Sequence, residues 1–268
     1  MNEPLLITRR GHTALITLNR PDTRNALSGE DMFAAFEALV DKLNADLSVR
    51  AAVLTGAGSA FCSGGNVAEM RDRTGMFAGS PEEITERYRQ GIQRIPRALT
   101  RLQVPLIAAV NGPAIGAGND LACMCDLRIA STTARFAESF VKVGIIPGDG
   151  GCWLLPRVIG HARAAELALT GDTIDADEAL RIGLVSRVVE PDQLLPDALA
   201  LASRIAANPP QVLRWTKQLL QQARTGTLDE ALDAAGRLQG LAHHTADHAE
   251  AVAAFFEKRA PVFSGGVA

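Results

Sequence analysis

The segment from Leu106 to Asp120, LIAAVNGPAIGAGND, constrains the fold more than any other part of the sequence. Its residues 107–110 are apolar on both faces and begin and end with β-branched side chains, which indicates a fully buried strand. Asn-Gly-Pro then forces a turn, and a helical pattern resumes after Gly116 and Gly118. The first backbone N–H groups of that helix have no partner within it, and the positive end of the helix dipole lies behind them. The segment therefore predicts a place that can hold a negatively charged oxygen.

A second glycine-rich segment, GAGSAFCSGGNVAEM at residues 56–70, has the same design. A strand at 51–55 leads through Gly64 and Gly65 into a helix that Asn66 is expected to cap. Two such donors that converge on one carbonyl oxygen would form an oxyanion hole. The alternative is that these glycines serve tight turns only. Their spacing matches neither the dinucleotide motif G-x-G-x-x-G nor a phosphate-binding P-loop.

Composition excludes several classes of protein. The chain has 268 residues, of which 47% are hydrophobic and 21% charged, so we expect one large domain, or one domain with an appendage. A net charge of −3 and an aromatic content of 4% do not favour nucleic acid as a partner. Neither a membrane span nor a signal peptide is expected. Four cysteines without C-x-x-C spacing argue against a disulfide framework or a zinc site, so we expect reduced thiols and a cytoplasmic protein.

The order of elements predicts two regions. Strand, loop and helix recur up to Val189, which predicts an α/β core coiled as a stack of similar turns over residues 1–191. Only helices are predicted for 192–268, and we expect their apolar face to contact another subunit. The long helices are predicted at 82–102, 193–207, 210–225 and 227–259.

Three carboxylates are the candidates for chemistry. Asp120, Glu138 and Asp149 lie beside apolar, glycine-rich loops. Each alone would be read as a helix cap or a turn residue. Together they indicate proton transfer, because apolar surroundings raise a carboxyl pKa towards neutral pH. The histidines between 243 and 248 include an i, i+4 pair without a third ligand, so no metal site is expected.

The sequence resembles the enoyl-CoA hydratase/isomerase (crotonase) superfamily over nearly its whole length. The resemblance rests on motifs that follow one another in the family's order: Asn19-Arg20-Pro21, Asn25-Ala26-Leu27, AFCSGGNVAEM, NGPAIGAGNDLACMCDLRIAS, GIIPGDGGCWLLPRVIG, GLVSRVV and AFFEKR. It implies a spiral of ββα turns, a helical C-terminal trimerisation region, assembly as a trimer or a dimer of trimers, and coenzyme A thioesters as substrates. No cofactor is implied, because coenzyme A is part of the substrate.

The resemblance also assigns site residues. It places the oxyanion hole at the backbone N–H groups of Gly65 and Ala117. Arg24 and Ala26 fall where relatives contact coenzyme A, while Phe255 and Lys258 match residues that reach a neighbouring subunit's ligand. We expect the remaining substrate contacts from the segments around the two amides: Ser63, Gly64, Asn66, Val67, Gly116 and Phe140.

Departures from the family pattern limit the reaction. Hydratases of this family use two glutamates; here the first position is Asp120 and the second is Phe140, which cannot move a proton. Asp149 lies one residue beyond Gly148, where some isomerases of the family carry an aspartate. The segment at 136–157 also looks closer to phenylacetate-pathway isomerases than to hydratases. Three hypotheses follow: a hydratase-like enzyme that uses Asp120 and Asp149, an enoyl-CoA double-bond or ring isomerase with one working carboxylate, and a non-catalytic acyl-CoA binder.

Overall fold

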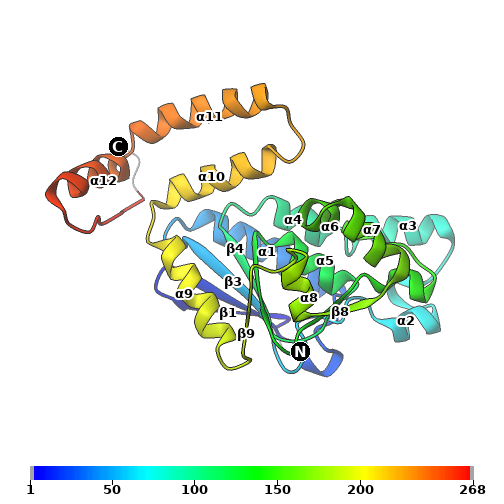
Figure 1. Cartoon of the computed structure of the whole chain (residues 1–268). Coiled ribbons are helices and arrows are strands. Elements are labelled where there is room, and N and C mark those ends of the chain that lie inside the picture. The colour runs from blue at the N-terminus through cyan, green and yellow to red at the C-terminus, as the bar shows by residue number, and fades with distance from the viewer. Residues whose placement is uncertain (1–2, 266–268) are drawn as a thin grey trace.

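A six-stranded sheet forms the centre of the computed structural model, which describes residues 3–265 (Figure 1). Its strand order is β1-β2-β3-β4-β6-β9, and every neighbouring pair is parallel except β1 and β2, which form an antiparallel hairpin. The strands are β1 (Leu5–Arg10), β2 (Thr13–Leu18), β3 (Ala51–Gly56), β4 (Leu106–Val110), β6 (Leu127–Ser131) and β9 (Arg187–Val189). A second sheet of three short strands contains β5 (Ala114–Ile115), β7 (Arg135–Ala137) and β8 (Thr173–Asp175). The predicted α/β class is confirmed.

Helices follow most of the strands, and four of them form the C-terminal part of the chain (Figure 1). Those of the body are α1 (Glu30–Ala45), α2 (Val67–Asp72), α3 (Pro81–Gln90), α4 (Arg94–Thr100), α5 (Ala117–Met124), α6 (Gly151–Ile159), α7 (His161–Thr170) and α8 (Ala176–Arg181). The C-terminal ones are α9 (Leu194–Ala206), α10 (Pro210–Gln222), α11 (Leu228–His243) and α12 (Ala246–Glu257). Among residues 3–265, no helix combines the length and the hydropathy that crossing a bilayer requires.

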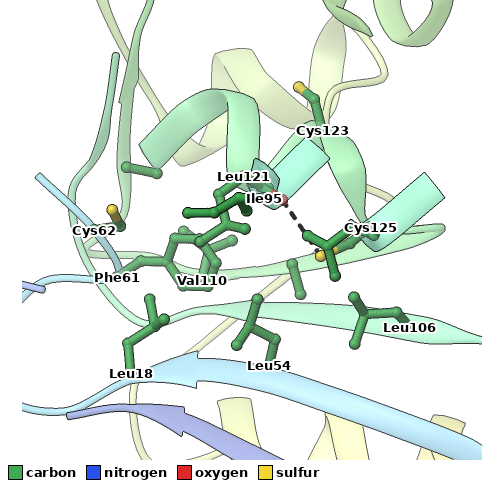
Figure 2. Close-up of a cluster of buried hydrophobic side chains, with 14 of the residues drawn as sticks. Leu18, Leu54, Phe61, Cys62, Ile95, Leu106, Val110, Leu121, Cys123 and Cys125 are labelled. Atoms are coloured by element: carbon green, nitrogen blue, oxygen red, sulfur yellow. Dashed lines mark hydrogen bonds between the residues drawn. The ribbon is translucent and has the colours of Figure 1, made fainter. Parts of the chain in front are cut away.

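The inner strands β2, β3 and β4 of the central sheet are buried on both faces, as the apolar run of β4 predicts, while the edge strand β1 is exposed beyond Leu5. On one face, Leu18, Leu54 and Leu106 pack beneath Ile95 of α4 and Leu121 of α5 (Figure 2). On the other face, alternate residues of the same strands pack against α9. Side chains of successive strand residues point to opposite faces, so a strand between two helical layers is apolar throughout. β4 thus holds the loop after it on a rigid support.

Two predictions about the helices are wrong. Helix α9 packs on the central sheet through Ala198 and Ala202, so it does not have its apolar face free for another subunit. The expected helices at 82–102 and 227–259 are each two helices. The first breaks at Gly91, where a Cβ atom would lie 2.4 Å from the carbonyl oxygen of Arg87. The second breaks at Thr245, whose hydroxyl accepts a hydrogen bond from the amide of His248 and caps α12.

Candidate active site

The loop after β3 is held in place by backbone hydrogen bonds to two other segments. The amide of Ser63 donates to the carbonyl of Arg24 at 2.9 Å, and the carbonyl of Gly64 accepts from Leu27 at 2.8 Å. On the other side, the carbonyl of Cys62 accepts from the amide of Ile115 at 3.0 Å. The loop then enters α2, and the Asn66 side chain caps this helix as predicted. The loop is therefore fixed on both sides before a ligand binds.

The loop after β4 enters α5 through two glycines that the packing requires. Gly116 has a φ of +53°, which side chains rarely adopt, and its amide donates to the carbonyl of Ala137 at 2.8 Å. A Cβ atom at Gly118 would lie 2.1 Å from the carbonyl oxygen of Cys62. The first turn of α5 and the loop after β3 are thus in direct backbone contact.

The two loops meet at Gly64 and Ala117. A Cβ atom at Gly64 would lie 2.5 Å from the carbonyl oxygen of Ile115 and 3.1 Å from the amide nitrogen of Ala117. Within residues 3–265, no group accepts a hydrogen bond from the amide of Gly65 or of Ala117. Two amides without partners therefore lie on adjoining loops, one of them at the N-terminal end of α5. This arrangement suits an oxygen that carries negative charge.

The three candidate carboxylates lie together beside the loop that enters α5. Asp120 in the first turn of α5 is 0% exposed, Glu138 after β7 is 1% exposed, and Asp149 before α6 is 3% exposed. A Cβ atom at Gly151 would lie 2.1 Å from Oε1 of Glu138 and 2.4 Å from Oδ1 of Asp120. The first residue of α6 must therefore be glycine, since any side chain would fill the space that these carboxyl groups share.

Burial controls the protonation of this cluster. Burial raises the pKa of Asp120 well above its ordinary value, and the charges of Asp149 and Glu138 raise it further. Burial also raises the pKa of Asp149. Burial raises the pKa of Glu138 to about 7, although the hydrogen bond from Asn119 lowers it. Among the described residues, no lysine or arginine pairs with any of the three. The cluster therefore retains protons at neutral pH.

A proton on Asp120 satisfies the cluster's hydrogen bonds. As carboxylates, the two oxygens of Asp120, Oδ2 of Asp149 and Oε1 of Glu138 have no donor within residues 3–265. A protonated Asp120 can donate to either of its neighbours, with which it is in hydrogen-bond contact. The charge of Asp149 also acts on Cys62 in the loop after β3 and on Tyr88 of α3. Because Asp120 contacts both of the other carboxyl groups, it lies between Asp149 and Glu138.

Apolar and aromatic side chains surround the loops. The Phe140 ring would lie 3.5 Å from a Cβ atom at Gly116, and it packs on the core beside the entrance to α5. Tyr88 on α3 lies against Gly148, where a Cβ atom would come within 2.4 Å of its ring. Sequence reasoning missed Tyr88, although it is the only tyrosine of the chain. The sequence predicts a helix at this residue, but no pattern in the sequence indicates that this helix lies against the site.

The remaining predicted contacts fall into two groups. Arg24 and Ala26 flank the loop after β3, next to Ser63 and Gly64, and Val67 begins α2 with an exposed side chain. Phe255 and Lys258 lie at the end of α12, which Figure 1 shows at the opposite end of the molecule from α2 and α3. Phe255 is 79% exposed there. A single chain thus brings the first group to the loops and leaves the second group far from them.

Comparison with known proteins gives consistent matches over the full length. The model of the family described as enoyl-CoA hydratase/isomerase matches residues 8–266. A probable enoyl-CoA hydratase of Mycobacterium tuberculosis is 40% identical over 98% of both chains. The 1,2-epoxyphenylacetyl-CoA isomerase of Escherichia coli is 39% identical over 93% of this chain and 94% of its own. The crystal structure of an enoyl-CoA hydratase from Bacillus anthracis superposes with a TM-score of 0.91 at 32% identity, covering 98% of this chain and all of the other.

Proposed function

Because the chain belongs to the enoyl-CoA hydratase/isomerase family, we propose that it converts enoyl-CoA thioesters through an enolate whose oxygen is held by the amides of Gly65 and Ala117. The observation that carries the proposal is the contact between the two loops, which places two amides without partners among residues 3–265 on adjoining loops beside a buried carboxyl cluster. Such donors stabilise the charge that develops on a thioester oxygen, because they are already oriented in a site with little water.

Asp149 and Asp120 supply the proton transfer in this proposal. The charge of Asp149 acts on Cys62 in the loop after β3, and Asp120 is in hydrogen-bond contact with Asp149. The raised pKa of each group matches the requirement for an acid or base that works near neutral pH. The amides stabilise the enolate while the carboxyl pair exchanges a proton with the carbon chain. No cofactor other than the coenzyme A part of the substrate is needed for these steps.

Hydration of a 2-enoyl-CoA is the first candidate reaction. Water adds to C3, the electrons move into the thioester carbonyl, and a proton then joins C2. Relatives named as hydratases support this assignment. Asp120 and Asp149 would then have to activate water and protonate carbon from one side of the substrate.

Double-bond isomerisation is the second candidate, and Phe140 favours it. By the resemblance, Phe140 falls at the position of the second hydratase acid, and the carboxyl groups of Asp120, Asp149 and Glu138 form one cluster. An isomerase needs one such group, which removes a proton from C2 of a 3-enoyl-CoA and returns it to C4. A relative named 1,2-epoxyphenylacetyl-CoA isomerase supports isomerase chemistry on a coenzyme A thioester.

Incubation of the purified protein with a 2-enoyl-CoA and, separately, with a 3-enoyl-CoA distinguishes the candidates. Hydration of the first substrate without isomerisation of the second supports the hydratase. Conversion of the second to the 2-enoyl product without hydration supports the isomerase. Binding of both without any conversion would support the non-catalytic acyl-CoA binder and contradict the catalytic proposal.

We also propose a homotrimer or a dimer of trimers, in which α12 of one copy completes the site of another. One support is that Phe255 is exposed and that its helix, α12, lies far from the loops of its own chain. The other is that Leu232 of α11 and Phe256 of α12 are exposed as well. The cytoplasm suits an enzyme with four free thiols, of which Cys62, Cys123 and Cys125 are buried.

A further inference from the structure

Glu138 is a buried carboxyl group to which the proposed reaction gives no role. It follows β7 directly, and the preceding residue, Ala137, binds Gly116 through its carbonyl. This backbone contact fixes the start of the Glu138 side chain relative to the loop that holds Ala117. The position of Glu138 is therefore fixed relative to the site, and its side chain is buried from solvent, with 1% of its surface exposed.

The two oxygens of Glu138 have different surroundings. Oε2 accepts a hydrogen bond from Nδ2 of Asn119 at 2.9 Å, within the buried first turn of α5. Oε1 has no donor among the described residues and faces the space beside Gly151 that Asp120 also faces. One side of the carboxyl group is therefore anchored, while the other is directed at Asp120.

The groups that face Glu138 are few. They are Asn119, Asp120 and Cys123 from α5, and Asp149 from the loop before α6. Burial raises the pKa of Cys123 to about 12, so this thiol stays neutral. An ionised carboxyl group without a cationic partner is costly to bury unless a proton is shared with it. Among the described residues, Asp120 is the neighbour in hydrogen-bond contact with both of the other carboxyl groups, so it can share a proton with either of them.

We propose that Glu138 is a positioning residue that receives, through Asp120, the proton that Asp149 removes from the substrate. This step rests on the proposed function. The C2–H bond breaks and its electrons enter the enolate. The proton joins the ionised Asp149 and passes from it to Asp120. Asp120, which starts protonated, gives its own proton to the ionised Glu138. Asp149 ends ionised and Glu138 neutral, and the reverse sequence returns the proton to the product.

This role predicts a dependence on pH that a purely structural role would not produce. Glu138 must be ionised to receive a proton, so turnover should rise with pH through the pKa of Glu138, which is about 7. A carboxyl group that only fills space would leave the pH profile unchanged when replaced by an amide of the same shape.

The test compares pH profiles of kcat for three variants and the native protein. Glu138→Gln should lower kcat by about 10- to 100-fold with a small change in KM, and it should remove the acid limb near pH 7. Glu138→Asp keeps an ionisable group and should restore part of the turnover. Glu166→Gln on the exposed face of α7 is the matched control and should leave the profile unchanged.

A further variant keeps the proposal testable if Glu138→Gln does not fold. Asn119→Ala removes the hydrogen bond that lowers the pKa of Glu138, so the acid limb should move to higher pH. A native profile in both Glu138→Gln and Asn119→Ala would overturn the role of Glu138 while leaving the proposed function intact. A native protein that converts no enoyl-CoA would overturn the proposed function itself, and the relay with it.

Discussion

The loops around the carboxyl cluster and the arm formed by α11 and α12 are built in opposite ways. At the loops, carboxyl groups are buried with no ionic partner among residues 3–265, and glycines permit contacts that no side chain would allow. On the arm, large apolar side chains such as Phe255 and Phe256 are exposed, while the charged Arg259 and Glu250 pair at its surface. The difference supports the proposal that the arm buries its apolar surface against another copy of the chain, whereas the carboxyl cluster is already buried within a single chain.

Asp149→Asn should produce the largest effect in the site. The amide has the shape of the acid but cannot exchange a proton, so kcat should fall by about 100- to 10,000-fold. The free energy of unfolding should not decrease, because a buried acid is replaced by a neutral group. Steady-state kinetics and urea unfolding measure both quantities. The control is Asp172→Asn, which lies on the surface beside Lys142; equal turnover in the two variants would contradict a role for Asp149.

The stability of the body should depend on pH through Glu138. Its pKa rises from 4.5 in the unfolded chain to about 7 in the folded protein, so the folded state binds more protons between these values. Its contribution to stability is therefore complete below pH 4.5 and is lost as pH rises through 7, a change of about 3 kcal/mol. Denaturant unfolding at pH 5 and pH 8 should show a smaller loss in Glu138→Gln than in the native protein. Identical pH dependence in the two proteins would argue against a buried, titrating Glu138.

Gly118→Ala tests the contact between the loops, and Gly240→Ala on the arm is its matched control. A methyl group at Gly118 would meet the carbonyl oxygen of Cys62, so the free energy of unfolding should fall by about 1–3 kcal/mol and turnover should drop. Nothing lies within 4 Å of a Cβ atom at Gly240, so alanine there should stabilise α11 by about 0.5–1 kcal/mol. Thermal unfolding of both variants measures these effects. Equal changes in melting temperature would contradict the difference in packing between the body and the arm.

Phe255→Ala should have the smallest effect on the stability of a single chain. The side chain is 79% exposed, so an isolated chain should lose less than about 0.5 kcal/mol. If α12 completes a neighbouring site, the variant should raise KM for an acyl-CoA with little change in kcat. Analytical ultracentrifugation and kinetics at several protein concentrations test this. An unchanged KM in an intact oligomer would exclude Phe255 from the ligand site.

The sequence predicted those features that depend on local patterns. The buried strand at 107–110, the cap at Asn66 and the glycine entry to α5 follow from side-chain periodicity and backbone freedom, and each is confirmed. The predicted crotonase-like fold is confirmed by the superposition on the enoyl-CoA hydratase structure. The prediction of the fold depended on the family motifs. The strands of a parallel sheet are far apart in the sequence, and no local pattern specifies which of them pair.

Features that depend on contacts between distant segments were not predictable in the same way. The packing of α9 on the sheet, and of Tyr88 against Gly148, joins residues far apart in the chain. The sequence offered Asp120, Glu138 and Asp149 as separate candidates, but their order and their shared space beside Gly151 come from the fold. The break at Thr245 had a local signal in its capping hydroxyl, which the continuous helical pattern around it obscured.

A crystal structure with an unreactive acyl-CoA analogue would test the central claim most directly. The thioester oxygen should lie about 2.7–3.2 Å from the amide nitrogens of both Gly65 and Ala117, with C2 of the acyl group facing Asp149. A thioester oxygen bound by only one of these amides, or bound elsewhere in the molecule, would contradict it.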